Sequence, residues 1–376
     1  MHSINFSSKS HSTEIDSLRA VAALLVFSYH AVTVMIKTAP AFPDTMAGFF
    51  VSFFFAGFTG VTLFFVISSF LLTIPFCLNP NAGRTRFFKK RLLRILPLYF
   101  VIVAIAGLVT KTAINNPTEV IRSFLFFFDA WSLFPFSVPW WSLRTEMEFY
   151  ILVGLLLPLI HFRRGIAVVL LSLALILLGR YIILSQTHLL FSNTFLFELL
   201  FQSAIAFAPT FLIGITASVV YVRYGMSIKN FVMKSRILNS IGADLIFFLL
   251  LALLAVVLSR VAAMDPVAAQ ISWPQHYTYE ALLWSLVLLS VILLPLRIKS
   301  LISNKYLARF GETTYSFYLI HLPLMYYVNV NILPVQSGFT SLYWGKVILI
   351  LVLALILSFL SYRFIEKPFL RIKDSF

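Results

Sequence analysis

Two ionisable residues, Arg19 and His30, lie within the apolar stretch EIDSLRAVAALLVFSYH near the start of the chain. Their separation is three helical turns, so a helix would point both from one face, roughly 16 Å apart along its axis. Ionisable side chains at membrane depth are costly and normally face the protein interior or a wet cavity. The spacing therefore indicates a functional pair inside a helical bundle. The alternative is that Arg19 anchors at the interface and His30 is a hydrogen-bonded structural residue.

The stretch WWSLRTEMEFY contains two carboxylates that could act beside a histidine. In a helix Ser142, Glu146 and Tyr150 share one face at i, i+4 spacing, whereas Glu148 points roughly 200° away from Glu146. We therefore expect Glu146 to face the bundle interior and Glu148 to pair with Arg144. The alternative is a salt-bridge cluster at the membrane interface.

Depth in the membrane connects these two stretches. Trp141 marks the outer interface, where indole rings prefer to lie, and Glu146 would lie roughly 7 Å below it. His30 would lie roughly 10 Å below the end of its own helix near Lys37, in the same outer layer. A neighbouring carboxylate fixes the tautomer of an imidazole and supports its protonated form, as a general base requires. The sequence thus predicts His30 as a base that is oriented by Glu146.

A basic run, RFFKKRLLRILPLYF, precedes the third apolar segment. Arg91 and Arg94 are neighbours at i, i+3 and could bind phosphate oxygens with paired N–H groups. A nucleotide-like donor such as coenzyme A would present those phosphates. The alternative is that the run only sets membrane orientation and attracts anionic lipid.

Near the C-terminus, GETTYSFYLIHLP places Tyr315, Tyr318 and His321 in one apolar segment. Tyr318 and His321 are i, i+3 neighbours in a helix. This second histidine is either a substrate-binding or proton-transferring group or a hydrogen-bonded structural residue. The later stretch YRFIEKPF is typical of a membrane exit, with Glu366 at the cytoplasmic interface and Pro368 stopping the helix.

The composition is that of an integral membrane protein: 60% of the 376 residues are hydrophobic, 11% are charged, and the mean hydropathy is +0.94. The single cysteine, Cys77, excludes an intramolecular disulfide and a metal cluster built from cysteines, and we expect no metal. Residues 1–13 are polar and lack the apolar core of a secretory signal peptide.

The apolar runs predict an all-α fold, a polytopic membrane bundle of about ten helices, each close to the roughly 20 residues that cross a bilayer. The expected helices cover residues 15–37, 49–77, 95–113, 142–160, 165–184, 196–222, 240–262, 277–296, 306–333 and 345–365. A short interfacial or re-entrant element is expected within 120–134. We divide the chain into a cytoplasmic tail at 1–14, a membrane domain at 15–368 and a cytoplasmic tail at 369–376.

Most of the 29 basic residues fall on alternate connections between these helices. Cytoplasmic loops carry the excess of Lys and Arg, so both termini are predicted to be cytoplasmic. The net charge of +15 is therefore mainly a topology signal, and we expect no nucleic-acid partner.

Several ordered motifs give the chain a resemblance to membrane-bound acyltransferase family 3, the bacterial multi-span O-acyltransferases of polysaccharides and glycosides. The motifs run from Asp16 to Pro368: Arg19 followed by His30, GVTLFFVISSF, the Arg91/Arg94 pair before ILPLY, WSLRTEMEFY, TYSFYLIH and FIEKPF. Two departures are Ser69, where the family usually has Gly, and the absence of a soluble C-terminal domain after the last helix. We therefore expect an acceptor to meet the membrane domain itself.

The resemblance implies transfer of an acyl group, commonly acetyl from cytoplasmic acetyl-coenzyme A, at the bacterial plasma membrane. The acceptor would be a hydroxyl of a cell-surface polysaccharide, lipid-linked glycan or glycoside. His30 matches the family's catalytic histidine and Arg19 its paired arginine. Arg91 and Arg94 match its basic pair, and Glu146 its acidic position. We assign the three arginines to donor binding.

The predicted mechanism is deprotonation of the acceptor hydroxyl by His30, with an acyl-histidine relay left open. Two other functions remain: a proton-coupled transporter or flippase, which also uses embedded ionisable residues, and a non-catalytic polysaccharide-assembly scaffold. The acceptor, the acyl chain and the oligomeric state stay open. The candidate acceptor-binding residues are Trp141, Arg144, Tyr150, Tyr315 and His321.

Overall fold

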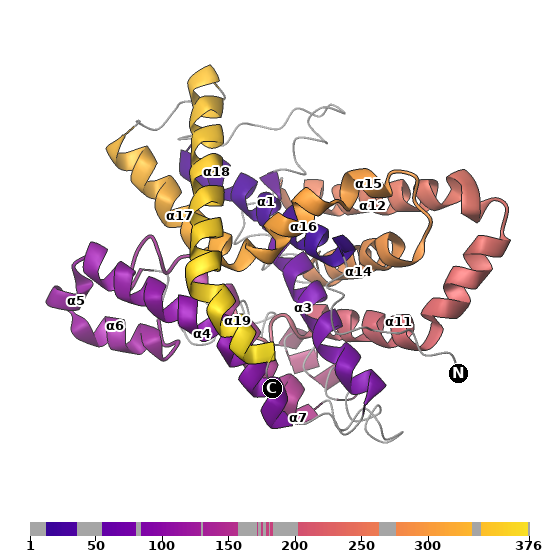
Figure 1. Ribbon diagram of the computed structural model, residues 1–376, viewed down its shortest axis with the longest axis horizontal. Helices are drawn as coiled ribbons and strands as arrows, with labels where there is room; N and C mark the ends of the chain where they lie inside the picture. Colours follow the sequence, from indigo (N-terminus) through magenta and orange to yellow (C-terminus); the bar gives the residue numbers. More distant parts are fainter. Residues whose placement is uncertain are drawn as a thin grey trace. The chain divides into compact units, whose positions relative to one another are not determined.

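The computed structural model describes residues 13–35, 55–79, 84–128, 131–156, 202–262, 276–332 and 340–374, with isolated helical residues between 171 and 182. The helices of the described part, shown in Figure 1, include α1 (Thr13–Met35), α3 (Thr59–Leu78), α4 (Arg84–Val109), α5 (Thr112–Asn115), α6 (Pro117–Phe124), α7 (Trp140–Leu156), α11 (Ala208–Lys234), α12 (Ala243–Ala262), α14 (His276–Leu293), α15 (Lys299–Ile302), α16 (Lys305–Glu312), α17 (Thr314–Asn331), α18 (Ser341–Ser361) and α19 (Lys367–Asp374).

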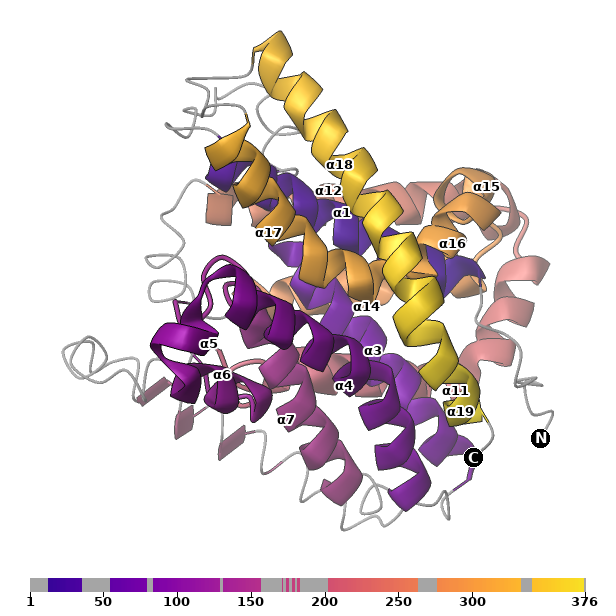
Figure 2. The ribbon, with the colours of Figure 1, turned by 60° about the vertical axis from the view of Figure 1, so that its left-hand side comes forward.

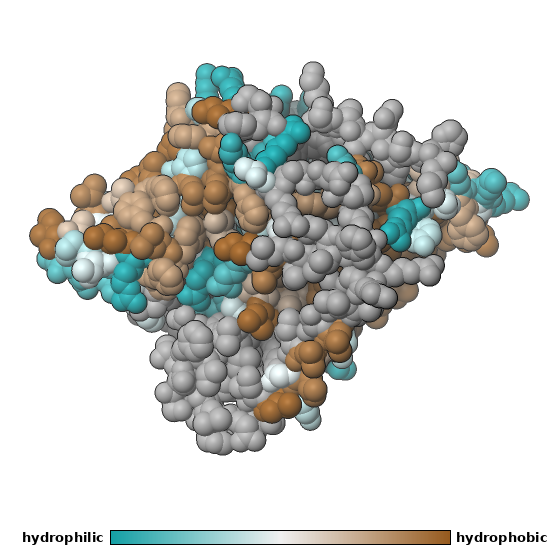
Figure 3. Space-filling model, turned by 90° about the horizontal axis from the view of Figure 1, so that it is seen from below, coloured by the Kyte–Doolittle hydropathy of each residue, from teal (hydrophilic) through white to brown (hydrophobic). Residues whose placement is uncertain are grey.

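The described residues contain helices and no strands, so the prediction of an all-α fold is confirmed for them. Within the described residues, seven helical segments are long and apolar enough to cross a membrane: 13–35, 59–78, 85–109, 208–234, 243–262, 276–293 and 341–372. The predicted helix at 165–184 lies almost wholly outside the described residues, and the total of about ten stays a prediction. Exposed apolar side chains such as Ile348 and Phe359 are abundant, and Figure 3 shows such surface in brown.

The chain divides into two compact units, which are described separately. Unit 1 comprises residues 1–26, 42–82 and 155–311, and unit 2 comprises residues 27–41, 83–154 and 312–376. Helix α1 contributes its first part to unit 1 and its last part, from Phe27, to unit 2. Arg19 therefore belongs to unit 1 and His30 to unit 2.

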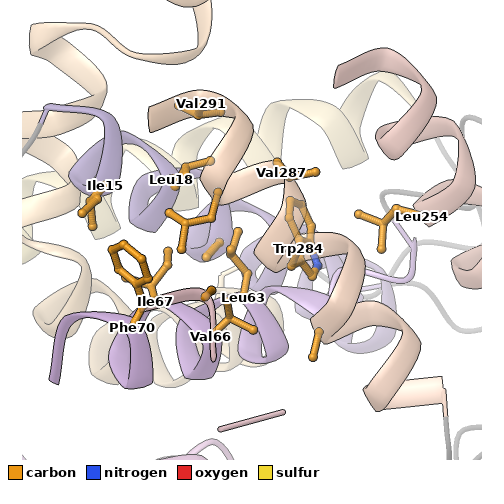
Figure 4. Packing of buried hydrophobic residues seen from close by; sticks show 14 of the residues in the cluster. Ile15, Leu18, Leu63, Val66, Ile67, Phe70, Leu254, Trp284, Val287 and Val291 are labelled. Atoms are coloured by element: carbon orange, nitrogen blue, oxygen red, sulfur yellow. The ribbon is translucent and has the colours of Figure 1, made fainter. Parts of the chain in front are cut away.

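Unit 1 is a helical bundle whose core lies between α3 and α14. Figure 4 shows Leu63 and Val66 of α3 facing Trp284 and Val287 of α14, and all four belong to one buried cluster. The indole N–H of Trp284 donates to Thr59 Oγ1 at 2.8 Å. The cluster also includes residues of α1 and α12. Burial of apolar side chains of this size contributes roughly 1.5–3 kcal/mol each relative to exposure in water.

Small residues on α3 allow close helix packing in unit 1. A Cβ atom at Gly60 would overlap the backbone oxygen of Ala22 on α1, and one at Gly214 of α11 would overlap the Ser69 side chain. Close packing through small residues is common between membrane helices. These contacts indicate that the small residues serve close packing between the helices.

Unit 2 is built around α4, α7, α17 and α18. Helices α17 and α18 lie side by side, and the short helices α5 and α6 fold back beside α4 (Figure 2). The phenol of Tyr99 on α4 donates to the backbone oxygen of Ser123 at 2.7 Å. Tyr99 also stacks on Phe126, and Trp140 at the start of α7 packs edge-on against it. These contacts fix the position at which α7 begins.

Several predicted helix boundaries are corrected by the structure. The basic run before Ile95 is helical, so α4 begins at Arg84, in keeping with the good helix propensities of Lys and Arg. Helix α11 likewise continues to Lys234. The predicted helix 306–333 is two helices, α16 and α17, separated at Thr313.

The prediction for the C-terminal stretch is also wrong in two respects. Pro368 does not stop a helix: a π-helical turn over Tyr362–Glu366 follows α18, and α19 begins at Lys367. In this turn the Lys367 N–H bonds to the backbone oxygen of Tyr362, and the helix continues through Pro368 without a break. Glu366 is buried, with 5% exposure, instead of lying at the interface.

Candidate active site

The centre of the candidate site is a pair of histidines from α1 and α17, within unit 2. Nδ1 of His30 lies 2.8 Å from Nε2 of His321, and the two rings are stacked with centroids 5.1 Å apart. His321 is buried, with 1% exposure, and lies against the rings of Phe27 and Phe317. His30 is half-buried. One imidazole is thus held inside the unit and the other is partly accessible.

The hydrogen-bond network assigns the tautomers of this pair. A backbone oxygen can only accept, so the 3.0 Å contact between His321 Nδ1 and the oxygen of Phe317 places a proton on that Nδ1. Nε2 of neutral His321 is then an acceptor, and Nδ1 of His30 donates to it. This assignment leaves the lone pair of neutral His30 on Nε2, ready to accept a proton.

The predicted partner of His30 is wrong. The structure places His321, and not Glu146, at Nδ1 of His30. Tyr150 donates its phenol proton to Glu146 Oε1 at 2.5 Å, in the i, i+4 arrangement expected on α7. The depth argument placed His30 and Glu146 in one layer but could not identify the helix that faces His30. That helix is α17, and the partner is His321.

A hydroxyl cluster joins α17 to the start of α7. Tyr318 donates to the backbone oxygen of Pro139 at 2.8 Å, and its oxygen lies 2.6 Å from Ser142 Oγ. The rings of Tyr318 and His321 have centroids 5.8 Å apart, as expected for i, i+3 neighbours. Ser142 stands one turn before Glu146 on α7, so polar groups continue from the histidine pair toward the carboxylate.

The basic end of the site lies where α4 meets α7. The guanidinium of Arg91 lies 5.9 Å from the ring centroids of both Phe87 and Tyr150. Its Nε is buried and makes no hydrogen bond with the described residues. Arg94 is one turn further along α4. A buried N–H with no acceptor in the described part of the chain suits an anionic ligand, because an unsatisfied buried donor is costly.

Of the remaining predicted residues, Tyr315, Arg144 and Trp141 lie in unit 2 with the site, and Arg19 lies in unit 1. Tyr315 donates to the backbone oxygen of Ile95 at 2.8 Å, which joins α17 to α4. Arg144 lies 3.8 Å from Glu148, as predicted, and Trp141 is half-buried on the same helix. Arg19 lies in unit 1, where its guanidinium is 3.7 Å from Asp16.

Two buried polar residues of unit 2, Asn329 and Lys346, went unrecognised in the sequence. Asn329 is two turns beyond His321 on α17, and its signal was only that a side-chain amide sits in an apolar helix. Lys346 is a lone basic residue within the predicted helix 345–365. Among the described residues no group of three or more His, Cys, Asp or Glu is arranged to hold a metal ion.

Comparison with known proteins identifies related chains. Residues 12–363 match the family model described as acyltransferase domain. A provisionally named acetyltransferase of Acidianus two-tailed virus is 29% identical over 189 residues, covering 49% of this chain and 53% of its own. A provisionally named O-acetyltransferase of Staphylococcus aureus strain COL is 25% identical, covering 94% of this chain and 56% of its own.

The O-acetyltransferase OatA of Staphylococcus aureus strain NCTC 8325 is 24% identical, with the same two coverages of 94% and 56%. The chain thus spans about half the length of the curated relatives that it matches. No solved structure shows a significant match to it.

Proposed function

Because this chain belongs to the acyltransferase domain family, we propose that it transfers an acyl group to a hydroxyl, with His30 as the general base. The family assignment also favours acyl transfer over the transporter and scaffold alternatives. The observation that carries the proposal is the His30–His321 hydrogen bond at 2.8 Å, which presents Nε2 of His30 as a base. The donor that we propose is acetyl-coenzyme A, and the acceptor is a carbohydrate or glycoside.

In the proposed reaction Nε2 of His30 takes the proton from the acceptor hydroxyl as its oxygen attacks the thioester carbonyl. The C–S bond then breaks, and the proton of His30 passes to the departing thiolate, so that an ester and a free thiol are formed. His321 stabilises the charged His30 because its Nε2 accepts from the Nδ1–H throughout. General-base assistance of this kind contributes typically about 10²- to 10⁴-fold.

The donor would be held at the basic end of unit 2. Arg91 has a buried Nε without an acceptor among the described residues, and Arg94 adds a second guanidinium one turn away. Paired guanidinium groups bind phosphate oxygens through several charge-assisted hydrogen bonds, which suits the phosphates of coenzyme A. Tyr150 lies against Arg91 through its ring and bonds Glu146 through its hydroxyl, so it holds the two charged groups at a fixed spacing.

Glu146 has a positioning role in this proposal. Its carboxylate accepts a hydrogen bond from the Tyr150 hydroxyl and lies on α7, the helix whose Tyr150 ring contacts Arg91. It therefore keeps the guanidinium oriented without neutralising it by direct contact at Nε. Arg19, on the first part of α1, is assigned to donor binding by the family resemblance.

The orientation of the protein in the membrane would decide the side from which each substrate approaches. Donor phosphates would enter from the cytoplasmic side, where the basic start of α4 is predicted to lie, and the acceptor would arrive from the opposite side. The candidate acceptor contacts are Trp141 and Arg144 near the start of α7. The bacterial plasma membrane is the location that we propose.

The test uses inverted membrane vesicles that contain the protein and receive radiolabelled acetyl-coenzyme A. We expect wild-type vesicles to form alkali-labile, labelled glycan or glycoside, and His30→Gln vesicles to lose at least about 100-fold of that rate. Thr33→Val, an exposed change one turn along α1, is the matched control and should keep the wild-type rate. Substantial transfer by a correctly inserted His30→Gln protein would remove His30 from the catalytic role.

A further inference from the structure

Unit 2 contains a second polar connection between α1 and α17, which lies beyond the histidine pair toward the C-terminal ends of both helices. Asn329 of α17 donates through Nδ2 to the backbone oxygen of Val34 at 3.1 Å. Val34 follows His30 by one turn of α1, and Asn329 follows His321 by two turns of α17. The same two helices are therefore joined at two successive levels.

Lys346 of α18 completes this connection. Its Nζ donates to Asn329 Oδ1 at 3.0 Å, and the side chain is buried, with 1% exposure. A lysine ammonium can only donate, so Oδ1 must be the atom that faces it and Nδ2 the atom that faces Val34. Lys346 thereby fixes the orientation of the Asn329 amide. Without it, the amide could rotate and place its oxygen against another oxygen.

The backbone oxygen of Val34, in the last described turn of α1, accepts the hydrogen bond from the Asn329 amide. Lys346, Asn329 and Val34 thus form a continuous polar link from α18 through α17 to α1. Burial of a lysine in a membrane protein is costly, and such residues usually serve a function.

We infer that Lys346, acting through Asn329, is a positioning residue that holds α1 against α17 at the spacing required by the His30–His321 hydrogen bond. This inference rests on the proposed role of His30. A displacement of catalytic groups by roughly 1 Å can lower a rate by about 10²-fold, which is the size of effect that a lost connection could produce. The donor site at Arg91 lies on α4 and should be unaffected.

The experiment compares acetyl transfer by wild type, Lys346→Met, Lys346→Arg and Asn329→Asp in vesicles. Lys346→Met should lower kcat by roughly 10- to 100-fold while KM for acetyl-coenzyme A stays within about twofold. Lys346→Arg keeps a donor and should recover most of kcat. Asn329→Asp keeps the acceptor for Lys346 but loses the donor to Val34, so kcat should fall while the thermal stability stays close to wild type.

The control Ile348→Ala changes an exposed residue of the same helix and should leave both constants unchanged. The inference is overturned if Lys346→Met and Asn329→Asp keep wild-type kcat. It is also overturned if KM for the donor rises with the loss, or if Lys346→Arg restores stability but not kcat. If Lys346→Met does not fold, Asn329→Asp decides alone. Wild-type vesicles that form no ester would instead reject the proposed function.

Discussion

At the scale of single residues, the site depends on groups that can only donate or only accept. The oxygen of Phe317 fixes the proton of His321, and His321 in turn fixes that of His30. A neutral imidazole thus takes the place that the sequence assigned to a carboxylate. The consequence is that His30 gains its orientation from an uncharged partner at Nδ1.

Replacement of His321 tests this ordering of tautomers. We expect His321→Leu to lower kcat by roughly 10²-fold, because His30 then has no fixed acceptor for its Nδ1–H and the wrong tautomer becomes populated. His321→Asn offers a side-chain oxygen in a similar position and should retain more activity than the leucine variant. Initial rates at saturating donor measure both. Equal activity of the two variants would contradict the tautomer assignment.

Two substitutions of Tyr150 separate the contribution of its hydroxyl, which bonds Glu146, from that of its ring, which contacts Arg91. Tyr150→Phe removes the hydrogen bond to Glu146 but keeps the ring beside Arg91, whereas Tyr150→Leu removes both. A cation–π contact contributes about 0.5–1 kcal/mol, so the leucine variant should raise KM for acetyl-coenzyme A roughly 2- to 5-fold above the phenylalanine variant. Donor titrations at fixed acceptor give this ratio. A ratio of one would mean that the ring does not position the guanidinium.

At the scale of elements, the sequence identified the helices themselves better than it identified which helices pack against each other. Hydropathy located α1, α4, α7 and α17, and i, i+4 spacing foresaw the Tyr150–Glu146 and Arg144–Glu148 pairs. These are local contacts, set by the geometry of one helix. The pairing of His30 with His321 joins residues 291 positions apart and depends on which helices pack together, which periodicity within either segment cannot reveal.

The C-terminal stretch shows the same limit, since the carboxylate of Glu366, which the sequence predicts at the interface, is buried. Glu366 accepts a hydrogen bond from Ser316, in the first turn of α17, where a negative charge is favourable. Glu366→Gln should therefore destabilise the protein by about 1.5–3 kcal/mol, the range for hydrogen bonds to charged groups. Thermal unfolding in detergent measures the loss as a lower midpoint.

The matched control for that change is Glu148→Gln. Its carboxylate is 39% exposed and lies 3.8 Å from Arg144, and exposed ion pairs contribute only about 0–1 kcal/mol. The midpoint should therefore stay near that of wild type. If both variants lose the same stability, the burial of Glu366 has no special effect on α17.

At the scale of the whole molecule, helix length and charge together predict the orientation in the membrane. Helix α4 has 26 residues, which is roughly 39 Å at 1.5 Å per residue, whereas the hydrocarbon core is about 30 Å thick. An untilted α4 would therefore extend into the headgroup region at one end. Its first two turns carry the basic run, so the excess length is expected on the cytoplasmic side, where anionic headgroups attract Lys and Arg.

This orientation can be measured on one helix with two cysteine probes. After Cys77→Ser removes the native thiol, Thr85→Cys and Lys111→Cys place a single thiol at either end of α4, at positions that are both exposed. In intact cells a membrane-impermeant maleimide should label the Lys111→Cys protein and leave the Thr85→Cys protein unlabelled until the membrane is permeabilised. The reverse pattern would place the Arg91 end outside the cell, away from a cytoplasmic thioester. The proposed direction of transfer, from a cytoplasmic donor to an external hydroxyl, would then be wrong even if His30 proved to be the base.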